Sequence, residues 1–248
     1  MSITAAGSDG SSGAGPAPTP GAAPTQPLVD LERHAPRSAG VAGILFSVLF
    51  AGSLLMAAVR PPEGLGEAEL IDWFRANGLG SITIAALYLA PFAGIAFLWF
   101  IGVIRDRIGA REDRFFATVF LGSGLLFVAM YWGAAAVLAS LVAGNRFDAA
   151  PEMNARTLEV VRSLAFSFLF VLAARAAAVF MIVTSTIALR TGVFPRLLIV
   201  AGYAIALVML FSLTFLQWIV LLFPAWVFVA SLYILAAEQR ERKVSAPV

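Results

Sequence analysis

Residues 160–189 read VVRSLAFSFLFVLAARAAAVFMIVTSTIAL, a long apolar run with Arg162 near its start and one charged residue, Arg175, near its centre. Thirty helical residues reach about 45 Å, which exceeds the roughly 30 Å of a bilayer's hydrocarbon core. The eleven Leu, Ile, Phe and Val residues between Ala165 and Ile187 each favour insertion by about 0.3 to 0.6 kcal/mol, whereas a central Arg opposes it by about 3 kcal/mol. The sum stays favourable, so the stretch predicts a membrane-spanning helix that carries a charge.

The composition of the whole chain agrees with this interpretation. Its 248 residues are 60% hydrophobic and 13% charged, and the mean hydropathy is +0.88. The apolar residues form uninterrupted runs instead of short amphipathic patterns, which is typical of membrane proteins. A net charge of only +2 gives no indication of a nucleic-acid partner. The absence of cysteine excludes disulfides, thiolate nucleophiles and cysteine-ligated clusters.

The runs predict an all-α bundle of six transmembrane helices. Residues 1–38 are rich in Gly, Ala, Ser and Pro and predict a disordered cytoplasmic leader. The bundle then occupies 39–237, and a basic cytoplasmic tail follows at 238–248. The predicted spans are about 40–59, 82–104, 115–142, 160–189, 197–213 and 218–236. The segment between the first two spans predicts a short helix lying at the membrane interface.

The distribution of basic residues predicts the orientation. The leader, the 105–114 loop, the 190–196 turn and the tail together hold eleven Lys and Arg residues, whereas the other two connecting segments hold five, with Arg162 at the edge of the fourth span. Basic segments remain on the cytoplasmic side. Both chain ends are therefore expected in the cytoplasm, as for a multi-pass protein of the cytoplasmic (plasma) membrane. Within the 190–196 turn, Gly192 predicts a helix C-cap and Pro195 the start of the next helix.

Two spans carry small residues at every fourth position, where another helix can approach closely. These residues are Ala39, Gly43, Ser47 and Ala51 near the first span, and Ala86, Ala90 and Gly94 in the second. Pro91 and Pro224 lie inside the second and sixth predicted spans, where proline is expected to kink the helix.

The predicted spans contain no residues suited to catalysis. No Asp, Glu, His, Lys or Cys lies within them, so the serine hydroxyls there have no base to activate them. The same lack disfavours proton-coupled transport. The single histidine, His34, precedes the first span and cannot ligate a metal or haem inside the membrane. We therefore expect neither an enzyme nor a metal or cofactor site.

Arg175 needs hydrogen-bond acceptors within the membrane. At a similar predicted depth, Tyr131 offers a hydroxyl acceptor, and Trp132 and Trp226 offer aromatic faces for a cation–π contact. Two interpretations stay open. Arg175 is either an interhelical clamp satisfied by carbonyls and Tyr131, or a basic site for an anionic ligand, a lipid head group or an acidic residue of another protein.

A second basic cluster precedes the third span. The sequence RDRIGAREDR at 105–114 contains Arg105, Arg107, Arg111 and Arg114. Such a loop is typical of a cytoplasmic orientation signal that contacts anionic lipid at the bilayer surface.

The six predicted spans, the basic second loop and the stretch GVFPRLLIVAGYAIAL at 192–207 resemble a group of bacterial six-helix membrane proteins that is known as a domain of unknown function. The topological likeness covers about 38–238. The resemblance implies the fold class alone, because the group carries no established active site to transfer.

Two functional hypotheses follow from these patterns. The chain is a small non-catalytic binding or accessory membrane component that packs against a membrane-protein partner or a second copy. Alternatively, it is a transport-like protein in which Arg175 binds an anionic or amphipathic ligand. The absence of an internal repeat favours the first hypothesis.

Overall fold

The computed structural model describes residues 27–108, 114–146, 154–211 and 217–244. The chain divides into two compact units, Met1–Arg33 and His34–Val248. Within the first unit, the described residues are helical from Pro27 onward. The account below concerns the second unit.

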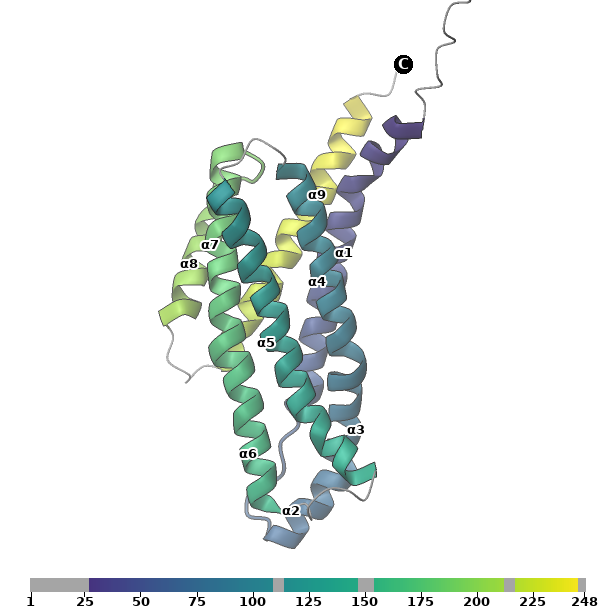
Figure 1. Cartoon of the computed structure of the whole chain (residues 1–248), viewed down its shortest axis with the longest axis vertical. Helices are drawn as coiled ribbons and strands as arrows, with labels where there is room; N and C mark the ends of the chain where they lie inside the picture. The colour runs from purple at the N-terminus through teal and green to yellow at the C-terminus, as the bar shows by residue number, and fades with distance from the viewer. Residues whose placement is uncertain (1–26, 109–113, 147–153, 212–216, 245–248) are drawn as a thin grey trace, which may run out of the picture. The chain divides into compact units, whose positions relative to one another are not determined.

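The second unit is a bundle of helices, and its described residues contain no strand (Figure 1). The α-helices are α1 (Pro27–Ala57), α2 (Glu67–Trp73), α3 (Leu79–Ile82), α4 (Ala90–Ile108), α5 (Arg114–Arg146), α6 (Ala155–Phe166), α7 (Ala174–Thr191), α8 (Arg196–Phe211) and α9 (Leu222–Val244). Three wider π-helical segments lie between them, η1 (Phe74–Gly78), η2 (Thr83–Leu89) and η4 (Ser167–Ala173), and one 3₁₀ segment, η5 (Gln217–Leu221), precedes α9.

Five helical segments are long and apolar enough to cross a membrane. They are Ser38–Ala57, Glu67–Arg105, Phe115–Ala143, Ala155–Thr191 and Trp218–Ala237. By length and composition, these helices suit a multi-pass membrane protein. The predicted all-α class is confirmed for the described residues, and the number of spans stays a prediction.

The fifth predicted span, 197–213, differs from the others. It corresponds to α8, whose 16 described residues are about 24 Å long, less than the roughly 30 Å hydrocarbon core. Residues 212–216, which follow, lie outside the described residues. The structure thus contains five long segments and one shorter apolar helix among its described residues.

Two other predicted boundaries differ. The segment between the first two spans was expected as a separate interfacial helix, but from Glu67 to Ile108 the helical segments follow one another without a break. The wide turns of η1 and η2 keep this path helical across Gly78 and up to Pro91. Helix α1 begins at Pro27, within the stretch predicted as a leader, and proline suits a first helical position.

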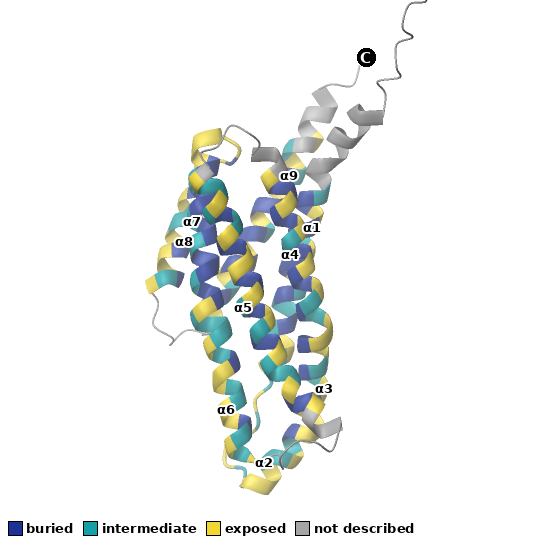
Figure 2. Cartoon of the chain, in the orientation of Figure 1, coloured by how far each residue is buried: buried dark blue, intermediate teal, exposed yellow. Residues whose placement is uncertain are grey.

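A cluster of phenylalanine rings forms the centre of the bundle, and the buried residues face inward along every long helix (Figure 2). Phe97 of α4 lies 4.6 Å from Phe46 of α1, 5.1 Å from Phe127 of α5 and 5.2 Å from Phe180 of α7, measured between ring centroids. Phe223 of α9 contacts Phe127 at 4.9 Å. The rings therefore join five helices, and each such pair contributes about 0.5 to 1.5 kcal/mol beyond its buried area.

Helix α9 packs along the small-residue side of α1. A Cβ atom on Gly43 would lie 2.0 Å from the Ser231 hydroxyl, and one on Gly40 would lie 2.4 Å from the Leu235 side chain. One step further along, the Ser47 hydroxyl donates to the Pro224 carbonyl at 2.9 Å. The stripe of the first predicted span is thus occupied by a helix of the same chain.

The ends of the helices follow their sequence signals. Gly192 adopts a left-handed conformation with φ of +70° and caps α7, and α8 begins directly after Pro195, as predicted. Near this turn, the Arg190 guanidinium lies 4.3 Å from the centre of the Phe116 ring, which ties α7 to the start of α5. At the opposite end, the Asn154 side chain accepts from the Thr157 amide at 2.8 Å and caps α6.

We expect Phe97→Ala to lower the free energy of unfolding by about 3 to 5 kcal/mol, because the ring is fully buried and its removal leaves a cavity. Phe92→Ala is the matched control, since Phe92 lies on the same helix with 58% of its surface exposed. Thermal denaturation of the purified protein in detergent measures both. Equal loss of stability in the two variants would contradict the central role of the ring cluster.

Candidate functional site

Arg175 lies midway along the long apolar segment Ala155–Thr191. It follows Arg162 by 13 residues and precedes Arg190 by 15, which are about 20 Å and 22 Å along a helix. Its side chain is half-buried and donates from Nη1 to the Val171 carbonyl at 2.9 Å. Among the described residues this is its one hydrogen bond, and the bond stays within its own helical segment. The charge is therefore not used to join two helices.

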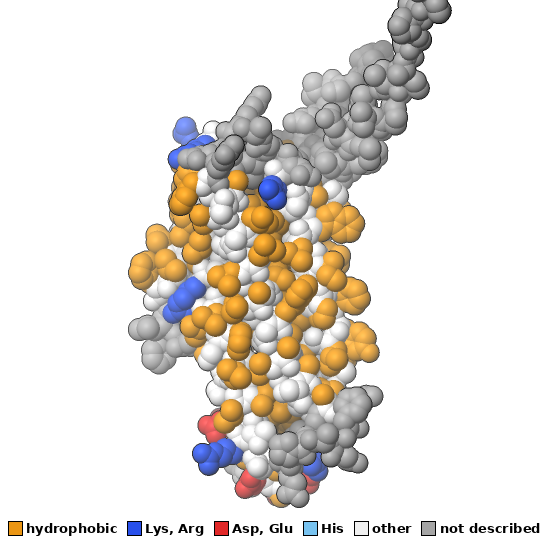
Figure 3. All heavy atoms as spheres, in the orientation of Figure 1, with side chains coloured by type: hydrophobic (Ala, Val, Ile, Leu, Met, Phe, Trp, Pro, Cys, Tyr) orange, Lys and Arg blue, Asp and Glu red, His pale blue; other side chains and the backbone are white. Residues whose placement is uncertain are grey.

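The side of the segment that carries Arg175 is turned partly away from the bundle. Leu172, one turn before Arg175, is 46% exposed, while Phe168 and Val179 are half-buried. Figure 3 shows a mainly hydrophobic flank between two ends where charged side chains gather, and a basic side chain interrupts that flank at mid-height. A charge in such a place is costly unless it finds an acceptor beyond its own helix.

Tyr131, the predicted acceptor for Arg175, makes a different bond. Its hydroxyl lies 2.6 Å from the Ser53 hydroxyl, and its ring is buried between Phe50 and Phe127. This pair joins α5 to α1. The structure therefore does not bring Tyr131 and Arg175 together, and the clamp interpretation loses its predicted partner.

The two tryptophans predicted beside Arg175 also bond elsewhere. Trp132 donates from Nε1 to the Ala90 carbonyl at 3.2 Å, and its indole fills the space beside Gly94. Trp226 is buried and donates to the Leu198 carbonyl at 3.1 Å. The second small-residue stripe, which includes the buried Ala86, thus packs against α5, and Trp226 joins α9 to α8.

The two prolines have different roles. Pro91 follows the π-helical η2, whose wider turns end at Leu89, so the missing amide donor of Pro91 falls where the helical pattern changes. Pro224 lies in the first turn of α9, where an amide hydrogen has no helical partner to lose. The α-helix begins at Leu222 directly after the 3₁₀ turn of η5, and the kink at Pro224 stays a prediction.

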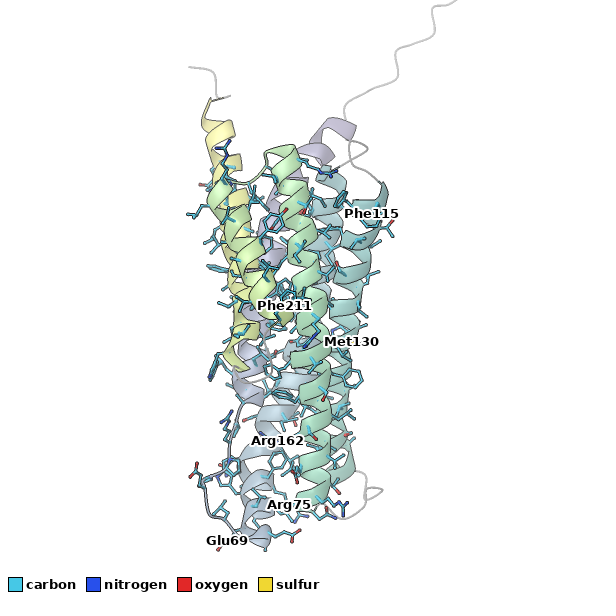
Figure 4. The ribbon with its side chains drawn as sticks, turned by 90° about the vertical axis from the view of Figure 1, so that its left-hand side faces the viewer. Glu69, Arg75, Phe115, Met130, Arg162 and Phe211 are labelled. Carbon is cyan, nitrogen blue, oxygen red and sulfur yellow. The ribbon has the colours of Figure 1, made fainter. Side chains whose placement is uncertain are left out.

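A cavity of about 460 Å³ lies at the end of the bundle where α1 ends and α6 begins. Its walls are mainly apolar, and two guanidinium groups, Arg60 and Arg162, belong to its lining. Figure 4 shows Arg162 in the same half of the bundle as Glu69 and Arg75, away from Phe115 at the other end. The lining residues are Leu54, Ala57, Ala58, Arg60, Ile82, Ala134, Leu138, Arg162, Ala165, Phe166, Leu169, Phe170, Trp218, Val220 and Leu221.

The sequence analysis did not identify Arg60 and Arg162 as a pair. They are 102 positions apart, and each was counted only as a basic residue, Arg60 in a connecting segment and Arg162 at the edge of the fourth predicted span. The signal that could have indicated them is topological, because in the predicted six-span arrangement the end of the first span and the start of the fourth lie on the same side. Their lateral proximity depends on helix packing, which periodicity does not reveal.

The structure also bears on metal-ligating side chains and on the arginines of the 105–114 loop. Among the described residues, no group of three or more His, Cys, Asp or Glu side chains is placed to hold a metal ion. Arg105 is exposed near the end of α4. The side chains of Arg107, Arg111 and Arg114 lie outside the described residues, so lipid contact by this loop stays a prediction.

Comparison with known proteins gives no relative. No protein-family model matches the chain, and neither a curated protein nor a solved structure does. The resemblance to the bacterial six-helix group therefore stays a prediction.

The Ser53–Tyr131 pair can be tested by a double-mutant cycle. We expect Tyr131→Phe to cost about 0.5 to 1.5 kcal/mol of stability, and Ser53→Ala to cost little more once Tyr131 is changed, because both remove the same buried hydrogen bond. Thermal denaturation of the two single variants and the double variant measures the coupling. Additive losses would show that the two hydroxyls do not stabilise each other.

Proposed function

We propose that the chain is a non-catalytic accessory component of a membrane, which associates with another membrane protein through the face of α7 that carries Arg175. The observation that supports this proposal is the charge of Arg175, which has one acceptor, a carbonyl of its own helix, within the described part of the chain. A carboxylate at matching depth on a partner helix supplies the missing counter-charge.

The chemistry of the chain itself favours a different protein over a second copy. No Asp or Glu lies between Val160 and Thr191. In the other apolar segments, Asp and Glu occur only close to the ends. A second copy would therefore bring another Arg175 to the same depth and repel it. The partner is expected to carry Asp or Glu in a transmembrane helix.

The spacing of the exposed face also suits a partner helix. From Phe168, the half-buried and exposed residues of this face recur at intervals of three and four, which places them on one side of the helix. They are Phe168, Leu172, Arg175, Val179, Ile182, Thr186 and Leu189. Thr186 already shares a 2.8 Å hydrogen bond with Tyr203 of α8, so the partner is expected to contact the half of the face nearer Leu172.

The partner can be located by photo-crosslinking in native membranes. With p-benzoylphenylalanine at Leu172, we expect one membrane protein to be captured, through a peptide that contains Asp or Glu. Arg175→Gln should abolish this crosslink without changing the amount of inserted protein. The same photoreactive group at Ile95 is the control, since Ile95 of α4 is 51% exposed on another helix.

Charge exchange then decides between contact and coincidence. Arg175→Glu should remove the crosslink, and replacing the partner's acidic residue with Arg should restore it. A crosslink that persists in Arg175→Gln, or that forms equally from Ile95, would overturn the proposal.

We also propose that both ends of the chain lie on the cytoplasmic side of a cytoplasmic membrane, as the distribution of Lys and Arg indicates. The chain lacks cysteine, so single introduced cysteines report topology without background. Glu63→Cys should react with a membrane-impermeant maleimide in intact cells. Thr191→Cys should react only after permeabilisation, because this exposed residue lies at the C-terminal end of α7, which the proposed orientation places on the cytoplasmic side. The reverse pattern would contradict the orientation.

A further inference from the structure

We propose that the cavity between α1, α5, α6 and η5 binds an amphipathic anion, whose phosphate or carboxylate head lies between Arg60 and Arg162 and whose apolar chain lies along the cavity wall. This site is separate from Arg175, which is not among the residues that line it. The inference therefore stands or falls independently of the proposed protein partner.

The charge of the site favours an anion. Arg60 and Arg162 both line the cavity, so two cations face the same space and repel each other. The described residues that line the cavity include no acidic side chain. Arg162 donates to the Val59 carbonyl at 3.5 Å, the outer limit of a hydrogen bond, and a guanidinium has five N–H donors. An anionic head group relieves the repulsion between the two cations and accepts hydrogen bonds from the remaining N–H groups of Arg162.

The walls of the cavity favour an apolar chain next to that head group. Thirteen of the fifteen lining residues are Ala, Val, Leu, Ile, Phe or Trp. They extend from Leu54 on α1, past Ala134 and Leu138 on α5, to Phe170 in η4. The volume of about 460 Å³ falls within the roughly 300 to 1,000 Å³ that is usual for sites of small molecules. A purely polar anion would leave most of this surface unused.

The space has a structural cause in the unequal lengths of the helices. Ser47 bonds Pro224 in the first turn of α9, yet α1 continues for ten residues beyond Ser47, about 15 Å, to Ala57. Among the described residues that precede α9, the short segment η5 lies beside the end of α1, and its Trp218, Val220 and Leu221 form one wall of the cavity. The cavity therefore results from the position at which α9 begins, partway along α1.

The location fits an amphiphile drawn from the bilayer. Arg60 follows the end of α1, and Arg162 lies two turns into α6, so both guanidinium groups are close to the end of the apolar segments. Long basic side chains at such positions reach toward lipid head groups while their stems contact apolar surface. A lipid anion at this depth places its head at the arginines and its chain deeper in the bundle.

The proposal can be tested with brominated ligands, because bromine quenches tryptophan fluorescence on contact and Trp218 lines the cavity. The full-length protein is placed in nanodiscs of phosphatidylcholine and titrated with dibromostearic acid or brominated phosphatidylglycerol. Brominated phosphatidylcholine measures quenching by unspecific lipid contact. The difference between the wild type and Trp218→Phe isolates the signal of Trp218 from that of the other four tryptophans.

We expect saturable quenching of Trp218 by an anionic ligand at concentrations at least about tenfold below those of brominated phosphatidylcholine. Arg162→Gln and Arg60→Gln should each weaken this binding about tenfold or more, since each removes a charge-assisted hydrogen bond. Arg75→Gln is the matched control, because Arg75 is exposed at the same end and does not line the cavity. Preference for the fatty acid identifies a single-chain carboxylate, and preference for phosphatidylglycerol identifies a phospholipid.

A second pair of variants tests the cavity without changing any charge. Ala134→Leu places a larger side chain in the cavity and should abolish the saturable quenching, whereas Ala136→Leu on the exposed side of α5 should leave it unchanged. Thermal denaturation confirms that each variant is folded. Equal quenching by anionic and zwitterionic lipids, or unchanged binding in both Arg162→Gln and Ala134→Leu, would overturn the proposal.

Discussion

A polar group inside a bilayer has no water to bond with, so it must find its partner within the protein. Three helix contacts of the bundle illustrate this constraint. The Ser47 hydroxyl bonds the Pro224 carbonyl, the Trp226 indole bonds the Leu198 carbonyl, and Tyr131 shares a bond with Ser53. Each bond joins two different helices beside the central phenylalanine cluster. Since lipid tails are as apolar as the ring cluster, close contact and these bonds, rather than exclusion of water, keep the helices together.

Arg175 departs from this arrangement and is for that reason the residue with the clearest link to function. Its bond to Val171 returns to its own helix, so it contributes nothing to contact between α7 and its neighbours α5 and α8. The expected aromatic partners, Trp132 and Trp226, instead complete interhelical bonds of their own. The bundle is thus held together without Arg175, and its charge is available to a partner outside the chain.

The sequence was sufficient for features that depend on neighbouring residues. Apolar runs located the long helices, and Gly192 marked a helix end because only a left-handed cap fits there. It was insufficient where length or lateral contact decided the result. Periodicity did not indicate that the helical path continues without a break from Glu67 to Ile108. Spacing of small residues indicated that a helix approaches α1, but it could not indicate that this helix is α9 of the same chain.

The same limit explains why the arginine pair was missed and why it matters. Arg60 and Arg162 belong to segments far apart in the chain, and only the packing of α6 beside the end of α1 makes them line one cavity. Because α9 begins opposite Ser47, the described residues that lie beside the end of α1 belong to the short segment η5. An apolar space that ends in positive charge fits neither a purely apolar nor a purely polar molecule, which leaves an amphipathic anion as its natural occupant.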